Sequence, residues 1–570
     1  MAIDPASGLQ SETALKVANL TVEFTLRAGV FAAVRDVSFN LQKGRTLCLV
    51  GESGSGKSVT ARALMQLIDA PGRIAAGQIL LDGTDIAALP PRGKAIRAIR
   101  GHRIGMIFQE PMSSLSPVHT IGAQIGEVLR LHLKMTKDQA RARTLELMQQ
   151  VEIPDAIRNI DRYTFEFSGG MRQRAMIAMA LACNPEILIA DEPTTALDVT
   201  TQAEVLDLIA RMQRELGMSL LLITHDMGVV AETADDVAVM HRGRIVEAGP
   251  VDAVFHGATH PYTQRLLSSV LKLERASALK RQPALTAPSR PILSVRDLAK
   301  TYHTRKGLFG SGTAVDVKAV DGVSFDLMAG ESLGIVGESG SGKTTLGRLI
   351  LRVVEPTSGQ ISYAPDSGQT TDIRGLGIRS LRGFHQQVRL IFQDPFASLN
   401  PRMTVKQIIG DPLVVHGIAR GARMQARVAD LMVSVGLDPL MMERYPHAFS
   451  GGQRQRIGIA RALALAPRIL IADEATSALD VSIRSQMLDL LLSLQQRLGL
   501  SVLFISHDIG VVRYFCDRVA VMRRGKIVEI GPAETICTSP EHPYTKALIS
   551  AVPRPDPRHP RMKTRTRFQA

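Results

Sequence analysis

The sequence predicts an α/β protein in which two similar domains follow each other along the chain. The octapeptide GESGSGK followed by Ser or Thr occurs twice, and short apolar runs alternate with helical patterns in both halves. Later landmarks recur at a nearly constant offset, since Ser168 and Ser450 are 282 positions apart, as are His225 and His507. A period of this length far exceeds that of solenoid repeats, so each copy is a whole domain.

Length and composition agree with two large folded domains. The 570 residues are 45% hydrophobic and 21% charged, which is ordinary for a globular protein. No stretch of 18 apolar residues is free of charge or proline, and the N-terminus lacks a signal-peptide pattern. We therefore expect a chain that is neither secreted nor membrane-spanning. The four scattered cysteines favour a reducing compartment.

Four segments are expected along the chain. They are a first domain over 1–270, a linker over 271–290, a second domain over 291–553 and a basic tail over 554–570, each domain ending in an extension that contains HPYT. The tail is interpreted as a solvated, disordered end, with contact to a membrane surface as the alternative. The net charge is +14, but no basic stripe is interleaved with aromatic residues and tryptophan is absent, so no nucleic-acid partner is predicted.

The elements of each half follow in the same order. Each half opens with strand-like alternation, as at Leu15, Val17, Leu20 and Val22, and continues with a second apolar run, CLV or LGIV. The Gly-rich octapeptide and a helical pattern come next, ARALMQLI in one half and LGRLILRVV in the other. These segments predict a strand, a loop and a helix in succession.

Three further apolar runs in each half predict buried strands. They are IGMIF and VRLIF, then ILIAD in both halves, then LLLITHD and VLFISHD. Helical patterns between Gln109 and Ser168 predict an inserted α-helical subdomain, and VAVMHRGRIVEAGP resembles a hairpin. We expect a mainly parallel sheet covered by helices in each domain, with an antiparallel β portion.

The octapeptides have the chemistry of phosphate-binding loops. Their glycines let backbone N–H groups surround phosphate oxygens, a lysine adds a positive charge for the outer phosphates, and a hydroxyl residue ligates Mg²⁺. The predicted ATP-binding residues are Gly51, Ser53, Gly54, Gly56, Lys57 and Ser58 in the first half and Gly337, Ser339, Gly340, Gly342, Lys343 and Thr344 in the second. Ser58 and Thr344 are also the predicted metal ligands.

Two acids end one strand in each half. Asp191 and Asp473 complete ILIAD, and Glu192 and Glu474 follow directly. The aspartates suit the Mg²⁺ shell, whereas the glutamates suit orienting or deprotonating the attacking water. The sequence therefore predicts two hydrolytic sites.

The order of these motifs, with SGG, ALD and a histidine after the next strand, resembles the ATP-binding-cassette (ABC) ATPases, a P-loop NTPase family, over most of the chain. The resemblance implies that two cassettes pack head to tail, with two ATP molecules sandwiched between the phosphate loop of one half and the SGG segment of the other. It implies catalytic roles for Gln109, Gln393, His225 and His507, with both glutamines near Mg²⁺, and ATP contacts from Ser168, Gly169, Gly170, Ser450, Gly451, Gly452 and Gln453. No separate ATPase subunit is then required.

An aromatic residue near the start of each half is a candidate for stacking on adenine. Alignment of the first strands places Phe24 opposite Tyr302. Phe24 continues the core stripe of Leu20 and Val22, so a core role is the alternative there, whereas the register of Tyr302 favours stacking.

Three segments resemble the peptide-importer branch of that family: FQEPMSSLSP with FQDPFASLNP, FSGGMRQR with FSGGQRQR, and HPYT at His260 and His542. The resemblance implies an ATPase for a bacterial importer of di- or oligopeptides or glutathione, peripheral on the cytoplasmic face of the inner membrane. Two transmembrane permease subunits and, indirectly, a periplasmic solute-binding protein would be its partners. Met171 departs from the pattern, because Gln453 stands at the matching position.

Two other functions fit part of the sequence. A tandem ABC ATPase that acts on ribosomes would also fuse two cassettes and accommodate positive charge. Those proteins use a long charged helical linker, which this chain lacks, and they do not account for HPYT. A non-hydrolysing scaffold would need a site without its glutamate, and both sites have one.

Overall fold

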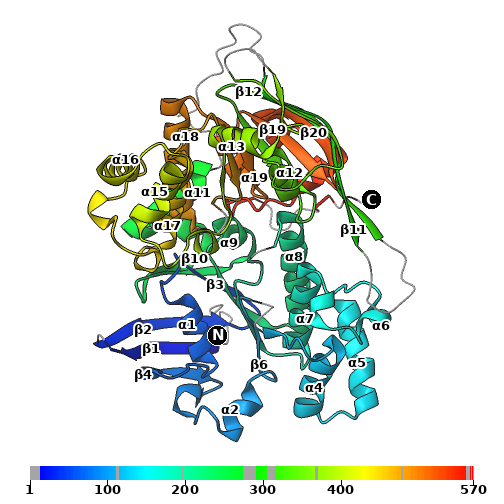
Figure 1. The fold of residues 1–570 in the computed structure, drawn as a ribbon. Helices are drawn as coiled ribbons and strands as arrows, with labels where there is room; N and C mark the ends of the chain where they lie inside the picture. Colours follow the sequence, from blue (N-terminus) through cyan, green and yellow to red (C-terminus); the bar gives the residue numbers. More distant parts are fainter. Residues whose placement is uncertain are drawn as a thin grey trace, which may run out of the picture. The chain divides into compact units, whose positions relative to one another are not determined.

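The computed structural model describes residues 13–27, 29–110, 114–195, 197–273, 291–304, 315–365, 370–476, 479–559, 565–566 and 568 (Figure 1). The chain divides into two compact units. Unit 1 comprises Met1–Ser268 with Val552–Thr564, and unit 2 comprises Ser269–Ala551 with Arg565–Ala570. Most of the predicted linker, from 274 to 290, lies outside the described residues.

The larger sheet of unit 1 has six strands in the order β10-β9-β3-β8-β7-β6. All neighbours are parallel except β9 and β10, which form the predicted hairpin. The strands are β3 (Thr46–Val50), β6 (Ile104–Ile107), β7 (Ile187–Asp191), β8 (Ser219–Thr224), β9 (Asp236–His241) and β10 (Arg244–Pro250). Every residue of β3, β7 and β8 is buried, as expected of parallel strands covered on both faces.

The smaller sheet of unit 1 is antiparallel, in the order β2-β1-β4-β5. Its strands are β1 (Thr13–Leu26), β2 (Gly29–Gln42), β4 (Gly72–Leu81) and β5 (Thr84–Asp85). The predicted alternation in β1 has a break, because the pairing register shifts between Val17 and Leu20 and Asn19 adopts a φ of 53°. This bulge returns Leu20 to the buried face that Val17 occupies.

The helices of unit 1 include the predicted inserted subdomain. In Figure 1 the helices α4, α5 and α7 lie together in cyan at one end of the unit. The α-helices are α1 (Lys57–Leu64), α2 (Lys94–Ile99), α4 (Ile121–Leu133), α5 (Lys137–Gln150), α6 (Ala156–Asn159), α7 (Gly169–Leu181), α8 (Val199–Leu216), α9 (Met227–Thr233), α10 (Val251–Gly257) and α11 (Pro261–Leu273), with 3₁₀ turns η1 (Ile86–Ala88) and η2 (Thr164–Glu166).

Unit 2 repeats both sheets. The six-stranded order is β16-β17-β18-β13-β19-β20 and the four-stranded order is β12-β11-β14-β15. The strands are β11 (Pro291–Thr304), β12 (Val315–Met328), β13 (Ser332–Val336), β14 (Ser358–Tyr363), β15 (Thr371–Asp372), β16 (Val388–Ile391), β17 (Ile469–Asp473), β18 (Ser501–Ile505), β19 (Arg518–Arg523) and β20 (Lys526–Pro532). The repeated topology confirms the predicted fold class.

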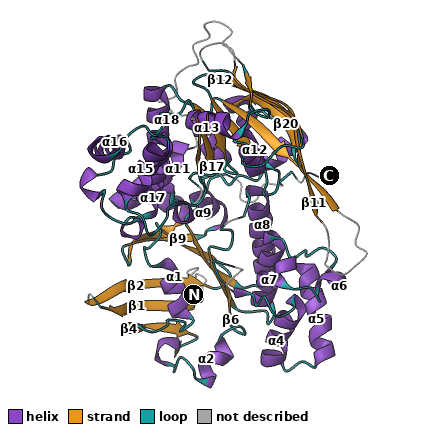
Figure 2. Cartoon of the chain, in the orientation of Figure 1, coloured by secondary structure: helices purple, strands orange, loops and turns teal. Residues whose placement is uncertain are grey.

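The helices of unit 2 also include an inserted group, α15, α16 and α17, which Figure 2 shows close together in purple. The α-helices are α12 (Lys343–Ile350), α13 (Ile378–Gln387), α14 (Pro395–Ser398), α15 (Val405–Val415), α16 (Gly421–Ser434), α17 (Gly451–Leu463), α18 (Val481–Leu498), α19 (Ile509–Phe515), α20 (Ala533–Thr538) and α21 (Pro543–Ser550), with 3₁₀ turns η3 (Pro439–Met441) and η4 (Pro446–Ala448).

One core in each unit joins the two sheets through the helix that follows the phosphate loop. In unit 1 this core contains Leu15 of β1, Leu49 of β3, Leu64 of α1 and Ile189 of β7. Leu346 and Leu349 of α12 have the same place in unit 2. Because α1 and α12 are buried between the two sheets of their units, they hold the end of the preceding phosphate loop in place.

Part of the basic tail, residues 554–559, belongs to unit 1 and contacts it. The guanidinium group of Arg558 donates to both carboxylate oxygens of Asp252, at 2.7 and 3.2 Å, and the backbone N–H of Arg554 points to Glu232 at 3.4 Å. The opposite charges on α9 and α10 explain why this part of the tail lies on unit 1. Among the described helices, none is both long and apolar enough to cross a membrane.

Candidate nucleotide-binding sites

Each phosphate loop lies between a buried strand and a helix, as predicted. Gly51 and Gly56 have φ angles of 151° and 106°, which favour glycine. A Cβ atom on Gly51 would lie 2.2 Å from the carbonyl oxygen of Met240, so the start of the loop is pressed against β9. Gly337 is confined in the same way, because a Cβ atom there would lie 2.1 Å from the carbonyl oxygen of Met522.

The loop lysines are buried and are held by the loops themselves. Lys57 Nζ donates to the carbonyl oxygens of Gly51 and Glu52 at 2.7 and 2.9 Å. Lys343 Nζ donates to the matching carbonyl oxygens at 2.6 and 2.7 Å. The first two residues of each loop therefore determine where the ammonium group stands.

A hydroxyl and a carboxylate meet at each predicted metal position. Ser58 Oγ donates to Asp191 Oδ1 at 3.0 Å, and Thr344 Oγ1 donates to Asp473 Oδ1 at 3.2 Å. Burial raises the pKa of Asp191 and of Asp473, and the neighbouring glutamate adds to the rise. A cation beside either aspartate would favour the ionised carboxylate and so offset this effect of burial.

These oxygen donors fit Mg²⁺, which prefers one or two protein ligands together with water and phosphate oxygens. No group of three or more His, Cys, Asp or Glu side chains that could hold a metal is present in the described part of the chain. In each unit the hydroxyl and the carboxylate would be among the ligands of such an ion, together with nucleotide and water oxygens.

Glu192 is the centre of a hydrogen-bonded cluster in unit 1. It accepts from Gln109 Nε2 at 3.0 Å and from Thr195 Oγ1 at 2.8 Å, and its Oε1 lies 3.2 Å from His225 Nδ1. Burial alone would raise the pKa of Glu192, but the bond to His225 and the charge of that ring outweigh it and lower the pKa to about 2. The carboxylate is therefore ionised and fixed in orientation.

Unit 2 repeats this cluster around Glu474. Gln393 Nε2 donates to Glu474 Oε2 at 2.6 Å, and His507 Nδ1 lies 3.2 Å from Oε1. Burial would raise the pKa of Glu474, but the bond to His507 outweighs it and the pKa is lowered. Burial would lower the pKa of His507, but the same bond outweighs it and the pKa is raised. The structure thus brings together the glutamine, glutamate and histidine that were singled out in each half.

Thr195 was missed by the sequence analysis. The signal available was a hydroxyl residue three positions after Glu192 in DEPTTALD, the spacing at which a side chain can bond back across a turn. The corresponding position in unit 2, Ser477, lies outside the described residues.

The SGG serines are the N-caps of exposed helix starts. Ser168 Oγ accepts from Met171 N and Ser450 Oγ accepts from Gln453 N, both at 3.3 Å. Gln453 Oε1 also accepts from the backbone N–H of Ser450 at 3.0 Å, so unit 2 has a full capping box, which methionine at 171 cannot form. A cap hydroxyl keeps its own proton for donation to a ligand.

The SGG glycines differ in their surroundings. A Cβ atom on Gly169 or Gly451 would meet nothing within 4 Å. A Cβ atom on Gly170 would lie 2.9 Å from Thr201, and one on Gly452 would lie 2.7 Å from Ile483. The first glycine of each segment faces open space, whereas the second allows close packing on the next long helix.

The two aromatic candidates differ in exposure. Phe24 is half-buried and packs against the core of unit 1, where its ring lies 2.6 Å from the Cβ position of Gly72. Tyr302 is 41% exposed, and Lys300 Nζ lies 5.3 Å from its ring centre. The exposed ring leaves a surface for stacking, which supports our preference for Tyr302.

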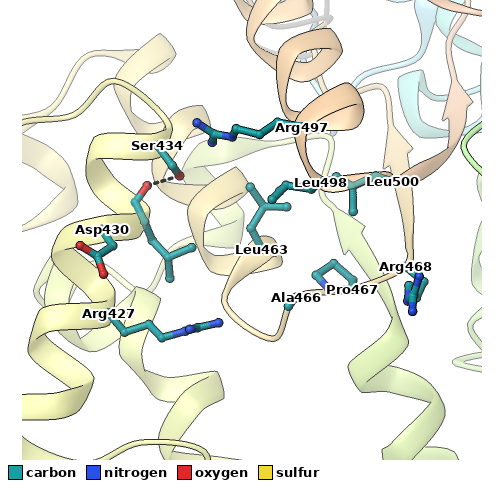
Figure 3. Close-up of a pocket in the computed structure, with 11 residues that line it drawn as sticks. Arg427, Asp430, Ser434, Leu463, Ala466, Pro467, Arg468, Arg497, Leu498 and Leu500 are labelled. Atoms are coloured by element: carbon teal, nitrogen blue, oxygen red, sulfur yellow. Dashed lines mark hydrogen bonds between the residues drawn. The ribbon is translucent and has the colours of Figure 1, made fainter.

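A pocket of about 330 Å³ opens in unit 2 among α16, the ends of α17 and α18, and Leu500. Figure 3 shows its leucine side chains between arginines that come from different elements, and no residue of the predicted ATP sites lines it. In the repeat, Arg468 and Arg497 correspond to Glu186 and Glu215. At these two positions the units therefore carry opposite charge.

The fold and the two sites define a nucleotide-binding ATPase with tandem phosphate loops. The family model described as ABC transporter matches residues 34–195 and 320–477. A second model, oligopeptide/dipeptide transporter, C-terminal region, matches residues 246–299 and 528–568. The chain belongs to the ABC transporter family, and it carries the C-terminal region of the oligopeptide/dipeptide branch in both halves.

Curated relatives match the chain over nearly its whole length. Glutathione import ATP-binding protein GsiA of Salmonella choleraesuis (strain SC-B67) is 49% identical over 96% of this chain and 91% of its own. The protein of the same name from Pectobacterium atrosepticum is 49% identical over 97% and 92%, and that of Escherichia coli (strain K12) over 96% and 91%. These matches do not support the ribosome-acting alternative.

Proposed function

We propose that this chain hydrolyses MgATP to drive the import of glutathione or another short peptide through separate permease subunits. The near-complete match to glutathione import ATP-binding proteins is the observation that carries this proposal. Both halves keep the lysine, the aspartate and the glutamate with its partners. We therefore expect hydrolysis at two sites.

The side chains have separate tasks in the proposed reaction. Lys57 and Lys343 bind the outer phosphates of ATP. Mg²⁺, when bound, neutralises charge on the phosphate oxygens; its proposed ligands are Ser58, Asp191 and Gln109 in unit 1 and Thr344, Asp473 and Gln393 in unit 2. Glu192 and Glu474 orient the attacking water and accept its proton, while His225 and His507 hold those carboxylates and approach the γ-phosphate.

Each site is proposed to be completed by the other half, so that Ser450 serves the ATP held by Lys57, and Ser168 serves the ATP held by Lys343. The exposed helix starts support this, because backbone N–H groups and a cap hydroxyl there form an anion site. The open space beside Gly169 and Gly451 leaves room for phosphate.

The proposed partners are two permease subunits at the cytoplasmic face of the inner membrane and, indirectly, a periplasmic solute-binding protein. Fractionation of cells tests this. Expressed alone, the chain should stay in the supernatant after ultracentrifugation. Co-expressed with its permeases, it should sediment with membranes and resist extraction by high salt. Sedimentation with ribosomes would contradict the proposal.

A further inference from the structure

The two HPYT segments lie far along the chain from the phosphate loops, yet each one reaches a loop. The hydroxyl oxygen of Tyr262 accepts a hydrogen bond from the backbone N–H of Glu52 at 3.0 Å. The hydroxyl oxygen of Tyr544 accepts one from the backbone N–H of Glu338 at 3.3 Å. Glu52 and Glu338 are the second residues of the two loops, so the same contact has been kept in both halves.

The other residues of the motif set the direction of the tyrosine. Pro261 begins α11, where a missing N–H costs nothing. His260 Nδ1 accepts from the backbone N–H of Tyr262 at 3.2 Å. Glu247 on β10 accepts from the backbone N–H of Thr259 at 2.7 Å and of His260 at 3.4 Å. The start of the helix is thereby tied to the sheet.

Unit 2 repeats this arrangement. His542 Nδ1 accepts from Tyr544 N at 3.1 Å, and Glu529 on β20 accepts from the backbone N–H groups of Glu541 and His542 at 2.8 and 3.2 Å. In both units the histidine side chain accepts from the backbone N–H of the tyrosine at the start of the helix.

The tyrosine rings are buried and held from the side. Tyr262 is 4% exposed and stacks on His241, with ring centres 4.1 Å apart. Tyr544 is 2% exposed, and the guanidinium carbon of Arg523 lies 5.1 Å from its ring centre. His241 and Arg523 end the matching strands β9 and β19. The hydroxyl groups therefore have little freedom to leave the loops.

One residue links each tyrosine to the loop lysine. The N–H of Glu52 bonds Tyr262, and the carbonyl oxygen of the same residue accepts from Lys57 Nζ at 2.9 Å. Glu338 links Tyr544 to Lys343 in the same way, at 2.7 Å. We propose that Tyr262 and Tyr544 are positioning residues of the two ATP sites, which hold the start of each phosphate loop and thereby the lysine that binds phosphate.

Removal of one hydroxyl group tests this inference, which rests on the proposed roles of Lys57 and Lys343. Tyr544→Phe is made in the full chain with Lys57→Ala, so that unit 2 alone binds nucleotide. We expect the Kd of a non-hydrolysable MgATP analogue to rise about two- to tenfold, the range that loss of one hydrogen bond gives. In steady-state assays KM should rise more than kcat falls.

Tyr514→Phe in the same background is the matched control. Tyr514 is also 2% exposed, and its hydroxyl donates to Asp489 on α18 instead of the loop. Both variants should lower the Tm, but only Tyr544→Phe should raise the Kd. Equal Kd values for the two variants would overturn the inference. If Lys343→Ala also left the Kd unchanged, the proposed site itself would be wrong.

Discussion

Nδ1 of His225 lies 3.2 Å from Oε1 of Glu192, and the same pair recurs in unit 2. Gln109 and Thr195 contact the second oxygen of this carboxylate. Both oxygens are therefore engaged, and the group is held as an ionised base with one orientation.

Glu192→Gln and Glu474→Gln should each bind ATP but impair turnover. An amide keeps the shape of the side chain and cannot accept the proton of the attacking water. Loss of such a group costs about 10²- to 10⁴-fold in the rate at the altered site. Nucleotide binding and ATPase activity are measured on both single variants. Full activity in one of them would mean that its site does not hydrolyse ATP in the wild type.

Thr195→Val should slow hydrolysis at the first site without weakening ATP binding. Valine has nearly the shape of threonine, so the main loss is the hydrogen bond to Glu192 Oε2. The loss of one such bond predicts a decrease of about two- to tenfold in kcat. The assay is best made with Glu474→Gln present, which confines turnover to unit 1. A rise in KM at unchanged kcat would contradict a role in orienting Glu192.

The composite sites can be tested within one chain. Ser450→Arg should block closure on the ATP held by Lys57, because the larger side chain fills the anion site. Adding Lys57→Ala should then cost little more, whereas adding Lys343→Ala should abolish the remaining activity. ATPase rates of the single and double variants decide this, provided the single variants keep measurable activity. Non-additivity with Lys343→Ala instead would show that each half completes its own site.

Acid should weaken the helical subdomain of unit 1 through Glu152. Burial would raise the pKa of Glu152, but bonds and charges from Arg211 and Arg174 hold the pKa below its usual value. A lowered folded-state pKa adds stability above the unfolded value of about 4.3, and this stability is lost as the pH falls through the folded-state value. The Tm of the wild type should thus fall more steeply below that pH than the Tm of Glu152→Gln. Parallel curves would refute this.

Periodicity and motif order were sufficient to predict the sheets, the helical subdomains and the identities of the acids, because each depends on local sequence. The bulge at Asn19 was not predictable from alternation, since it needs a shift in strand pairing. The bond from Thr195 to Glu192 spans three positions, so the sequence carried a local signal for it. The contact of Tyr262 with Glu52 joins residues that are distant in sequence, and neither spacing nor composition records such a contact. The place of Arg558 on Asp252 likewise depends on charges distant in sequence.

Transport in a reconstituted system tests the central claim most directly. The chain is combined with its permease pair in proteoliposomes, with MgATP on the side of the chain and the binding protein with labelled glutathione or dipeptide on the other. We predict uptake that requires this chain and ATP and that is lost in the Glu192→Gln/Glu474→Gln double variant. Uptake that persists in the double variant, or ATP hydrolysis without any peptide or glutathione uptake by the wild type, would contradict the account.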